Sequence, residues 1–464
     1  MSIRCHHLDK WSFMNLDLVE EILEKHAKAV VLVGGSTSSG KSFCAHHLRD
    51  FLNQRGHPST ILSTDSYNRG VTAIITDKVE ENDFDGSLPD KETILSIATP
   101  IVRDTPFEDK FDKNCCRKIA EALKEQVPDE IIDRYIKGCS REIKKLNFDE
   151  PTVYDLKLVA QDIGKLLNGE TIQKRSYSKV ISERVPSEEY VDGSAYQVFI
   201  VEGIYVLSDN LLKHIDRTSA VTDFVEGSSK SLFLRRVIRD AKTTSASNAF
   251  TIAMYFNNIV KSYKETILPS SRNADIIFKN DISFEELREG NLYTTKEKIP
   301  VTSPSFLSEL LSEAEVLSKS YQKDLYIIGS DDAPDRNNLL RMREISSDEG
   351  RTYVPSSLVH KGSPKTRKDG REIRPINILL EKEEFQKVFR NENDFLKRFS
   401  EGGLTLDRTV YKIKWKIRYR GLSLTLSSIG GEGFQLEFTD PETPRERIEE
   451  IRKEADPLIA SSVG

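Results

Sequence analysis

A glycine-rich loop placed directly after an apolar run is the feature that most constrains how this chain folds. Residues 29–33 read Ala-Val-Val-Leu-Val, and residues 34–42 continue as Gly-Gly-Ser-Thr-Ser-Ser-Gly-Lys-Ser, which matches G-x-x-x-x-G-K-S. In such a loop the backbone N–H groups surround nucleotide phosphates, the lysine reaches the β- and γ-phosphates, and the serine hydroxyl binds Mg²⁺. The sequence therefore predicts a strand, loop and helix that bind ATP and Mg²⁺ through Gly35, Ser36, Ser38, Ser39, Gly40, Lys41 and Ser42.

Composition narrows the class of protein. A net charge of −6 argues against a general nucleic-acid or membrane binder, so neither partner is expected. No run approaches the ~18 apolar residues of a membrane span, and the N-terminus lacks a signal-peptide pattern, so a cytoplasmic protein is expected. The five cysteines show no metal-ligand spacing and are interpreted as reduced thiols.

The pattern of predicted elements changes near residue 285. Before it, strand and helix signals alternate as in α/β domains with a parallel sheet, beginning with a helix at about residues 16–28. Apolar runs at residues 59–63 and 197–201 are typical of buried central strands, and they end at Asp65 and Glu202. Because ligands gather at the carboxyl ends of parallel strands, both acids are expected beside the glycine-rich loop. We therefore predict a P-loop α/β domain over residues 1–285 and a second domain over 286–464.

Phosphoryl transfer explains why these residue types recur. The reaction needs a phosphate cradle, a metal, neutralising cations and an oriented acceptor hydroxyl. Lys41 is one candidate catalytic group, and Glu202 is expected to hold Mg²⁺ together with Ser42 and Asp65. Asp65 is also expected to accept the proton of the acceptor hydroxyl, with a turn-forming role as the alternative for an isolated aspartate.

Two further segments carry candidate ligand contacts. Asp149 precedes a helix predicted over residues 156–167 and is a candidate to grip a pair of sugar hydroxyls, with a helix-entry turn as the alternative. In residues 234–240, helical spacing puts Arg235 or Arg236 on one face with Arg239. Such a face would clamp the ATP phosphates, whereas a solvated basic helix is the alternative interpretation.

In their order along the chain, these segments resemble the uridine kinase/phosphoribulokinase family of P-loop kinases across about residues 30–280. The resemblance rests on the glycine-rich loop and on residues 64–67, 147–151, 177–184, 200–204, 235–240 and 274–277. It implies that Asp65 is the catalytic carboxylate, that Asp149 contacts a sugar, and that Tyr177 and Arg184 belong to the acceptor pocket. It also implies a lid over the triphosphate that contains Arg235, Arg236 and the catalytic Arg239.

Three departures limit what the resemblance implies about the acceptor. Members that phosphorylate nucleosides carry a histidine five residues after the pocket tyrosine, where this chain has Ser182. They also carry an acidic residue directly after that tyrosine, where this chain has Ser178. The lid arginine that usually follows the Arg-Asp pair is replaced by a segment that begins at Lys242. A uridine acceptor is therefore not implied, and a slow, altered or lost kinase activity is left open.

Between Tyr67 and Asn147 the chain carries roughly 75 additional residues, too many for a simple connection in a compact domain. An acidic turn at residues 80–86 is followed by helical patterns at about 113–124 and 128–146. We interpret residues 69–146 as a helical insertion that either caps the acceptor site or forms a partner surface, and the sequence does not choose between them.

After residue 285 the alternation of apolar and basic residues is typical of antiparallel strands. In residues 339–344 and 411–420 it places several cations on one sheet face. A solvated outer face is one interpretation, and a closed barrel whose cations line a polyanion tunnel is the other. The tunnel candidates are Arg341, Arg343, Lys361, Arg374, Lys414, Arg418 and Glu437.

This second half resembles the CYTH, or triphosphate tunnel, superfamily in residues 340–344, 359–362 and 434–437. The resemblance implies an antiparallel barrel with basic residues for triphosphate and carboxylates for metal. The opening Glu-x-Glu-x-Lys signature is not evident at residues 294–298, and Gln435 stands where a second acid is usual. Because metal-assisted hydrolysis needs those carboxylates, binding of a polyphosphate or nucleotide is favoured over hydrolysis.

Three functions therefore compete. The first is an ATP-dependent kinase that phosphorylates a hydroxyl of a nucleoside or sugar-like small molecule through Lys41, Asp65 and Glu202. The second is a phosphohydrolase of pyrophosphate, triphosphate or nucleotide in either half, and the third is a regulatory protein that binds nucleotide without turnover. We favour the kinase, and the oligomeric state, including a homo-oligomer, is left open.

Overall fold

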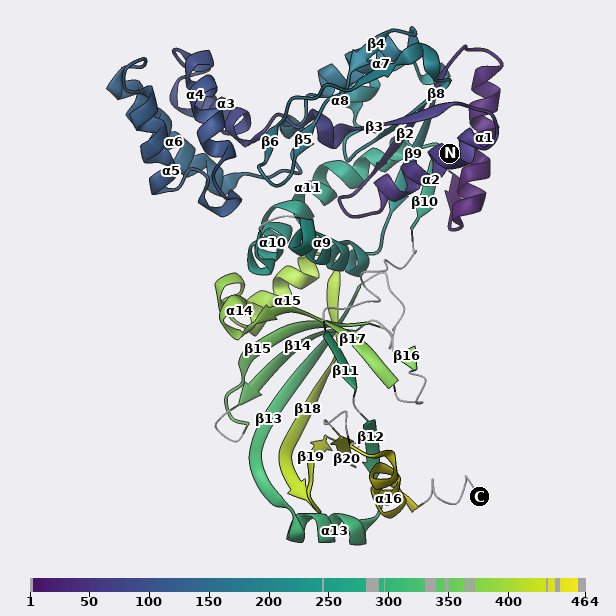
Figure 1. The fold of residues 1–464 in the computed structure, drawn as a ribbon, viewed down its shortest axis with the longest axis vertical. Helices are drawn as coiled ribbons and strands as arrows, with labels where there is room; N and C mark the ends of the chain where they lie inside the picture. Colours follow the sequence, from purple (N-terminus) through teal and green to yellow (C-terminus); the bar gives the residue numbers. More distant parts are fainter. Residues whose placement is uncertain are drawn as a thin grey trace. The chain divides into compact units, whose positions relative to one another are not determined.

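The computed structural model describes residues 3–243, 246–280, 292–295, 297–329, 339–346, 350–362, 365–366, 372–430, 433–438 and 443–457. The chain forms two compact units, Met1–Ile282 and Ser283–Gly464, and each has a sheet and a hydrophobic core of its own (Figure 1). Within the described residues, no helix combines the length and the apolar character that crossing a bilayer requires.

The first unit is built on a parallel sheet with the strand order β1-β10-β9-β2-β8-β3. These strands are β1 (Ile3–Cys5), β10 (Ile276–Lys279), β9 (Ala220–Glu226), β2 (Ala29–Gly35), β8 (Val198–Glu202) and β3 (Ser59–Ser63). The predicted strands at 29–33, 59–63 and 197–201 are β2, β3 and β8, which are neighbours in the sheet. Glu202 is in register with both Val33 and Ser63, so the carboxyl ends of these three strands meet at one edge.

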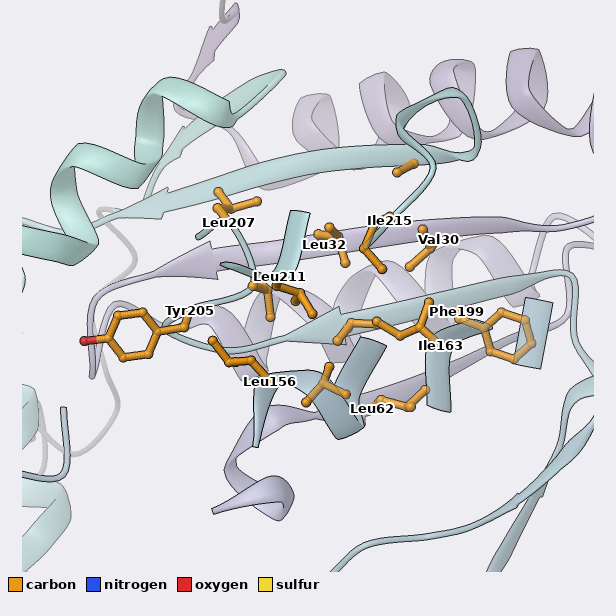
Figure 2. Packing of buried hydrophobic residues seen from close by; sticks show 14 of the residues in the cluster. Val30, Leu32, Leu62, Leu156, Ile163, Phe199, Tyr205, Leu207, Leu211 and Ile215 are labelled. Atoms are coloured by element: carbon orange, nitrogen blue, oxygen red, sulfur yellow. The ribbon is translucent and has the colours of Figure 1, made fainter. Parts of the chain in front are cut away.

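Alternate residues of the central strand β2 contribute to two cores on opposite faces of the sheet. Val31 and Val33 share a core with α1 (Leu8–Leu23) and α2 (Lys41–Asn53). Val30 and Leu32 share the other core with α7 (Leu156–Leu167) and α8 (Asp209–Leu212), and Figure 2 shows side chains of α7 beside these strand residues. Because successive strand residues point to opposite faces, a continuous apolar run covers both sides.

The first helix begins earlier than its apolar spacing indicates. The pattern predicts a helix at about residues 16–28, whereas α1 covers Leu8–Leu23. Its first half buries Ser12 and Asn15 beside Trp11, and the Asn15 amide donates to the Trp11 carbonyl oxygen at 3.1 Å. Polar residues on the inner face therefore conceal the helical period there.

The insertion between β3 and α7 is a group of four helices with its own core (Figure 1). They are α3 (Val71–Asp83), α4 (Lys91–Arg103), α5 (Lys113–Leu123) and α6 (Asp129–Glu142). The predicted helices at 113–124 and 128–146 are α5 and α6, while α3 and α4 were not predicted. The acidic stretch at residues 80–86 is only partly a turn, because α3 continues through it to Asp83.

Smaller elements complete the first unit. The 3₁₀ turn η1 (Thr64–Tyr67) follows β3, and β9 is followed by α9 (Ser229–Thr243), α10 (Asn248–Met254) and α11 (Val260–Ser262). Two short antiparallel pairs join β4 (Thr171–Gln173) to β7 (Tyr190–Asp192) and β5 (Tyr177–Ser178) to β6 (Glu183–Arg184).

The second unit is an antiparallel sheet with the strand order β11-β17-β15-β14-β13-β18-β19-β20-β12, and a short β16 also pairs with β17. The strands are β11 (Leu292–Thr295), β12 (Glu297–Val301), β13 (Glu315–Gly329), β14 (Leu339–Ser346), β15 (Val354–Lys361), β16 (Lys365–Thr366), β17 (Glu372–Glu381), β18 (Leu404–Tyr419), β19 (Leu422–Ile429) and β20 (Gly433–Phe438). The helices are α13 (Pro304–Glu313), α14 (Lys382–Val388), α15 (Glu392–Glu401) and α16 (Arg445–Ala455).

The predicted closed barrel requires a correction. The hydrogen-bonded path runs from β11 to β12, and no pairing among the described residues joins these two edge strands. Thr295 and Glu297 are only two residues apart in the chain, so the sheet curls until its edges approach each other. The described fold is therefore a curled antiparallel sheet without a closing ladder.

Candidate functional site

The glycine-rich loop joins β2 to α2, and its path depends on two glycines. Gly35 has a φ of 142°, and a Cβ there would lie 2.3 Å from a backbone oxygen of β9. Gly40 has a φ of 93°, and a Cβ there would lie 2.2 Å from Nδ2 of Asn280, which donates to the Ser39 carbonyl oxygen at 2.8 Å. Neither position tolerates a side chain. The hydroxyls of Ser38 and Ser39 are buried without a hydrogen-bond partner among the described residues, and they are available to phosphate oxygens.

Lys41 is buried at the start of α2 and folds back over its own loop. Its ammonium donates to the Ser36 carbonyl oxygen at 2.7 Å. Burial lowers the pKa of Lys41, whereas nearby carboxylates oppose that shift. These carboxylates belong to Glu202, Asp65 and Asp149. The ammonium therefore lies where three segments distant in sequence come together.

Glu202 ends β8 and is buried beside two hydroxyls. Its carboxylate accepts hydrogen bonds from Ser63 at the end of β3 and from Ser42 at the start of α2. Burial raises the pKa of Glu202, and the charge of Asp65 raises it further. No cluster of three or more His, Cys, Asp or Glu side chains in the described ranges could hold a metal. A carboxylate next to a hydroxyl fits Mg²⁺, which takes its remaining ligands from phosphate and water.

Asp65 lies in η1, directly after β3, and forms an ion pair with Lys179 at 2.7 Å. Burial alone would raise the pKa of Asp65, but the charge and hydrogen bond of Lys179 lower it, assisted by Lys41 and Arg239. Asp65 is therefore held ionised at neutral pH. An ionised carboxylate at this position is suited to accept a proton.

Asp149 lies on the loop before α7, and the residue is 4% exposed. Its Oδ2 has no hydrogen-bond partner among the described residues, while Oδ1 lies 3.9 Å from Nη1 of Arg236. The backbone is held on both sides, because the Asp149 N–H donates to Asn147 Oδ1 and the Tyr205 hydroxyl donates to the Asp149 carbonyl oxygen. A buried, unpartnered carboxylate oxygen in a fixed loop is suited to bind a ligand hydroxyl.

The three arginines of α9 have different surroundings. Arg235 is buried and donates to the Ser39 carbonyl oxygen at 3.4 Å, so it supports the loop. Arg236 donates to Thr37 Oγ1 at 2.7 Å and to Asp240 at 2.5 Å. Arg239 also contacts Asp240, at 2.9 Å through Nε. Asp240 therefore positions Arg236 and Arg239 beside the loop.

The two predicted acceptor-pocket residues, Tyr177 and Arg184, also have different surroundings. Tyr177 on β5 hydrogen-bonds Ser182, and burial raises the pKa of its hydroxyl. Arg184 on β6 donates through Nε to the Asn68 carbonyl oxygen at 2.7 Å and through Nη2 to the Tyr67 carbonyl oxygen at 3.1 Å. The guanidinium of Arg184 is therefore engaged with the backbone that follows Asp65, rather than pointing unpaired into a pocket.

Two residues that the fold brings to the site, Tyr154 and Lys179, were not selected from the sequence. Tyr154 lies close to Asp65 and Asp149, since both charges, after burial, raise the pKa of its hydroxyl. Lys179 pairs with Asp65. A tyrosine five positions after Asp149 and a lysine two positions after Tyr177 are weak signals, because only the folded loops place them beside the catalytic candidates.

A second charged cluster lies in the second unit around Asp324 of β13, which is fully buried. Arg343 donates to both of its oxygens, at 2.7 and 2.8 Å, and Lys412 donates at 2.9 Å. Burial alone would raise the pKa of Asp324, but the hydrogen bond from Arg343 and the charges of the neighbouring cations hold it far below its usual range. Arg341 lies 3.7 Å away, and its Nε is buried without a hydrogen-bond partner among the described residues.

The other tunnel candidates have mixed placements. Lys361 lies near Arg341 and Arg343; burial and these like charges lower its pKa to about 6. Lys414 donates to Glu437 at 3.0 Å. Arg418 is exposed and pairs with the exposed Glu315 at 2.9 Å, so it does not join the buried cations. The side chain of Arg374 lies outside the described part of the structure.

Comparison with known proteins relates the first unit to nucleoside kinases. A model of the phosphoribulokinase/uridine kinase family matches residues 131–283. Over 149 residues the chain is 31% identical to a uridine kinase of Bacillus pumilus, covering 31% of this chain and 69% of that protein. It is 32% identical to a uridine kinase of Anoxybacillus flavithermus over 133 residues, 29% of this chain, and spans only 61% of that relative's length. A solved structure titled as a possible uridine kinase from Bacillus stearothermophilus covers 57% of this chain and 99% of its own, at 12% identity; its TM-score of 0.29 is too low to support a conclusion.

Proposed function

Because this chain belongs to the phosphoribulokinase/uridine kinase family, we propose that its first unit transfers the γ-phosphoryl group of ATP to a hydroxyl of a nucleoside or sugar-like small molecule. One observation carries the proposal. The buried ammonium of Lys41 lies among the carboxylates of Asp65, Asp149 and Glu202, at the edge where the carboxyl ends of β2, β3 and β8 meet.

Each group then has a distinct task in the transfer. Bound ATP and Mg²⁺ supply the phosphoryl group and neutralise its charge. The loop N–H groups, Lys41, Arg236 and Arg239 bind and orient the phosphates. Asp65 accepts the proton of the acceptor hydroxyl, whose oxygen bonds to the γ-phosphorus while the bond from that phosphorus to the β–γ bridging oxygen breaks.

The acceptor is expected to use the unpartnered oxygen of Asp149. A vicinal hydroxyl pair would donate to this carboxylate, and the nearby Tyr154 offers an aromatic surface. Ser182 offers no imidazole to read a base, which supports an acceptor class broader than uridine. The proposal therefore specifies the reaction and the hydroxyl-rich chemistry of the acceptor, not a single compound.

The test is phosphoryl transfer from γ-labelled Mg-ATP to a panel of nucleosides, sugars and sugar phosphates. We expect transfer to at least one hydroxyl acceptor and its loss in D65N, with ATP binding retained. Lys118 is an exposed residue of α5, so K118A serves as the control that should keep wild-type transfer. Transfer that survives in D65N, or labelled phosphate released without any acceptor product, would contradict the proposal.

A second candidate function concerns the second unit. Four basic side chains surround the single carboxylate of Asp324, so the cluster has more basic groups than acidic ones. They are Arg341, Arg343, Lys361 and Lys412. We propose that this cluster binds an inorganic polyphosphate or the phosphates of a nucleotide. Partly buried cations bind such anions more strongly than solvated ones, because the local dielectric constant is lower.

Titration with tripolyphosphate tests this binding, and phosphate release measured in parallel tests hydrolysis. R341A should weaken tripolyphosphate binding, whereas K416A, an exposed lysine of β18, should not. If R341A combined with E437A left hydrolysis intact, the second unit would not be where hydrolysis occurs. Unchanged tripolyphosphate binding in R341A would overturn the second proposal.

A further inference from the structure

The first unit contains a cavity of about 680 Å³ that the proposed phosphoryl transfer does not use. It lies between α5 and α6 of the helical insertion and α10 outside it, and is lined by residues of all three helices. Its volume is in the range of small-molecule binding sites, roughly 300–1,000 Å³. The size therefore permits a ligand much larger than water.

The lining of this cavity is mostly apolar. The side chains that form its walls include Phe107, Phe111, Ile136, Ile143, Phe250 and Met254. The insertion core borders the cavity: Ile119, Leu123 and Tyr135 are fully buried in it, and Phe111, Cys116 and Leu146 belong to both the core and the cavity wall. Several cavity residues, by contrast, are only half-buried, as Ile136 and Ile143 are. An apolar surface left incompletely buried in this way gains free energy when an apolar ligand covers it.

Cations surround the apolar walls. Lys113, Arg117 and Lys144 line the cavity and are exposed, and Lys113 and Lys144 form no ion pair with any described residue. The two acids of the lining are already engaged: Asp112 accepts from two backbone N–H groups at the start of α5, and Glu108 accepts from the Ser247 N–H at 3.0 Å. With Lys110, the lining has four basic side chains against these two carboxylates, so its net charge is positive and complements an anionic group.

We propose that this cavity binds a small amphipathic anion, with an apolar chain or ring against the walls and one carboxylate or phosphate group beside Lys113 and Lys144. Apolar burial would provide most of the affinity, and the two lysines would select an anionic head group over a neutral one.

The same cavity is connected to the phosphoryl-transfer site through packed side chains. The Phe107 ring lies 5.4 Å from that of Phe148, the neighbour of Asp149, and 5.4 Å from that of Phe250 on α10. Leu146 lines the cavity, and its carbonyl oxygen accepts from Asn258 at 3.2 Å. A ligand that orders these residues would also bias the loop that holds Asp149, so its binding is coupled to nucleotide binding; this coupling rests on the proposed function.

Calorimetric titration with decanoate, decyl phosphate and decanol, all below their aggregation concentrations, tests the site in the full chain. We expect at least one anion to bind with one-to-one stoichiometry and roughly tenfold more tightly than decanol. A preference between the two anions identifies the head group as carboxylate or phosphate. If neither anion binds, or if decanol binds as tightly as both, the proposal is overturned.

Variants then locate the binding. A120F fills the cavity from α5, and K113E with K144E reverses the free charge; each should weaken anion binding roughly tenfold or more. K118E changes an exposed lysine on the same helix that does not line the cavity, and it should leave the affinity unchanged. Thermal unfolding of each variant verifies that it is folded. Affinity that survives in both A120F and the double charge reversal would place the anion elsewhere and overturn the assignment.

Repeating the titration with a non-hydrolysable ATP analogue and Mg²⁺ bound tests the coupling. The anion affinity should change, and by linkage the anion should change analogue affinity by the same factor. Analogue binding measured alone separates the two claims: an analogue that binds without altering anion affinity overturns the coupling, whereas failure of phosphoryl transfer with intact coupling counts only against the kinase proposal.

Discussion

The two units place charge around their candidate phosphate sites in opposite ways. In the first unit the buried ammonium of Lys41 lies among three carboxylates, and the nearby Arg236 and Arg239 are both paired with Asp240. In the second unit several cations surround one carboxylate, Asp324, and all contacts come from side chains of the sheet. Because the carboxylates near the first loop offset its cations, a divalent cation would help that site to hold a triphosphate, whereas the cations of the second site outnumber the carboxylate that they surround. The comparison indicates that the two sites should respond differently to mutation and to pH.

The largest effect is expected from removing Lys41, the buried cation at the centre of the first site. K41A should lower kcat/KM for phosphoryl transfer by at least about 10³-fold, because one preorganised charge at the transferring group is typically worth that much. Tripolyphosphate binding to the second unit should not change. Steady-state kinetics and calorimetry on the same preparation measure both quantities. R341A is the reciprocal variant, and a large loss of phosphoryl transfer in R341A would break the separation between the sites.

The next effect concerns stability in the second unit. Asp324 neutralises cations that are themselves buried, so D324N should lower the free energy of unfolding by about 3–5 kcal/mol, the range seen when one partner of a buried pair is removed. Tripolyphosphate should restore part of that stability, since it supplies the missing negative charge. Chemical denaturation with and without tripolyphosphate measures this.

An exposed ion pair of the same unit provides the control. Glu315 and Arg418 are both more than half exposed, so E315Q should change the free energy of unfolding by less than about 1 kcal/mol. Equal losses in D324N and E315Q would show that burial does not distinguish the two pairs.

A pH effect should separate the sites as well. Burial and the neighbouring arginines lower the pKa of Lys361 to about 6, so this lysine is largely neutral at pH 7.5. A bound polyanion favours its ammonium form, so binding takes up a proton, and affinity should fall by up to about tenfold per pH unit above pH 6. Calorimetry in buffers of different ionisation enthalpy measures the uptake. K361M should reduce the proton uptake that accompanies polyanion binding, whereas K416M should leave it unchanged. Proton uptake that persists in K361M would show that another group takes up the proton.

The same shift has a defined sign for stability. Between pH 6 and the ordinary lysine pKa near 10.5, the unfolded chain binds more protons than the folded chain, so the stability of the second unit should rise with pH through this window. Below pH 6 the lysine is protonated in both states, and its contribution no longer varies with pH.

The smallest effect is expected at the Asp65–Lys179 pair. Lys179 lowers the pKa of Asp65, so K179M should move the acidic limb of the pH profile of kcat/KM to higher pH. K174M removes a lysine that pairs with the exposed Glu189 and should leave the limb in place. A profile that shifts equally in both variants would show that Lys179 does not act through Asp65.

Much of the first unit could be predicted from its sequence because buried parallel strands leave a strong pattern. The runs that become β2, β3 and β8 are continuous and apolar, and the acids that follow them arrive at one sheet edge by topology alone. The pattern is weaker in α3, which buries Thr72 and Thr76 and was not predicted. In the second unit the sequence indicated the strands, whereas the closed barrel that the resemblance implied is not formed among the described residues. The alternation of side chains specifies the faces of a strand and says nothing about which edges pair.

By itself, the amino-acid sequence determined the phosphate loop, the parallel strands around it and the basic antiparallel strands of the second half, because local periodicity and backbone requirements specify these features. Only the tertiary structure decided which partner each basic side chain contacts. Arg235 donates to the loop backbone, while Arg236 and Arg239 both pair with Asp240. Lys179 pairs with Asp65, and Arg418 remains exposed to solvent. The reason is physical: a charge acts through its distance and its burial, and both are properties of folded neighbours far apart in the chain.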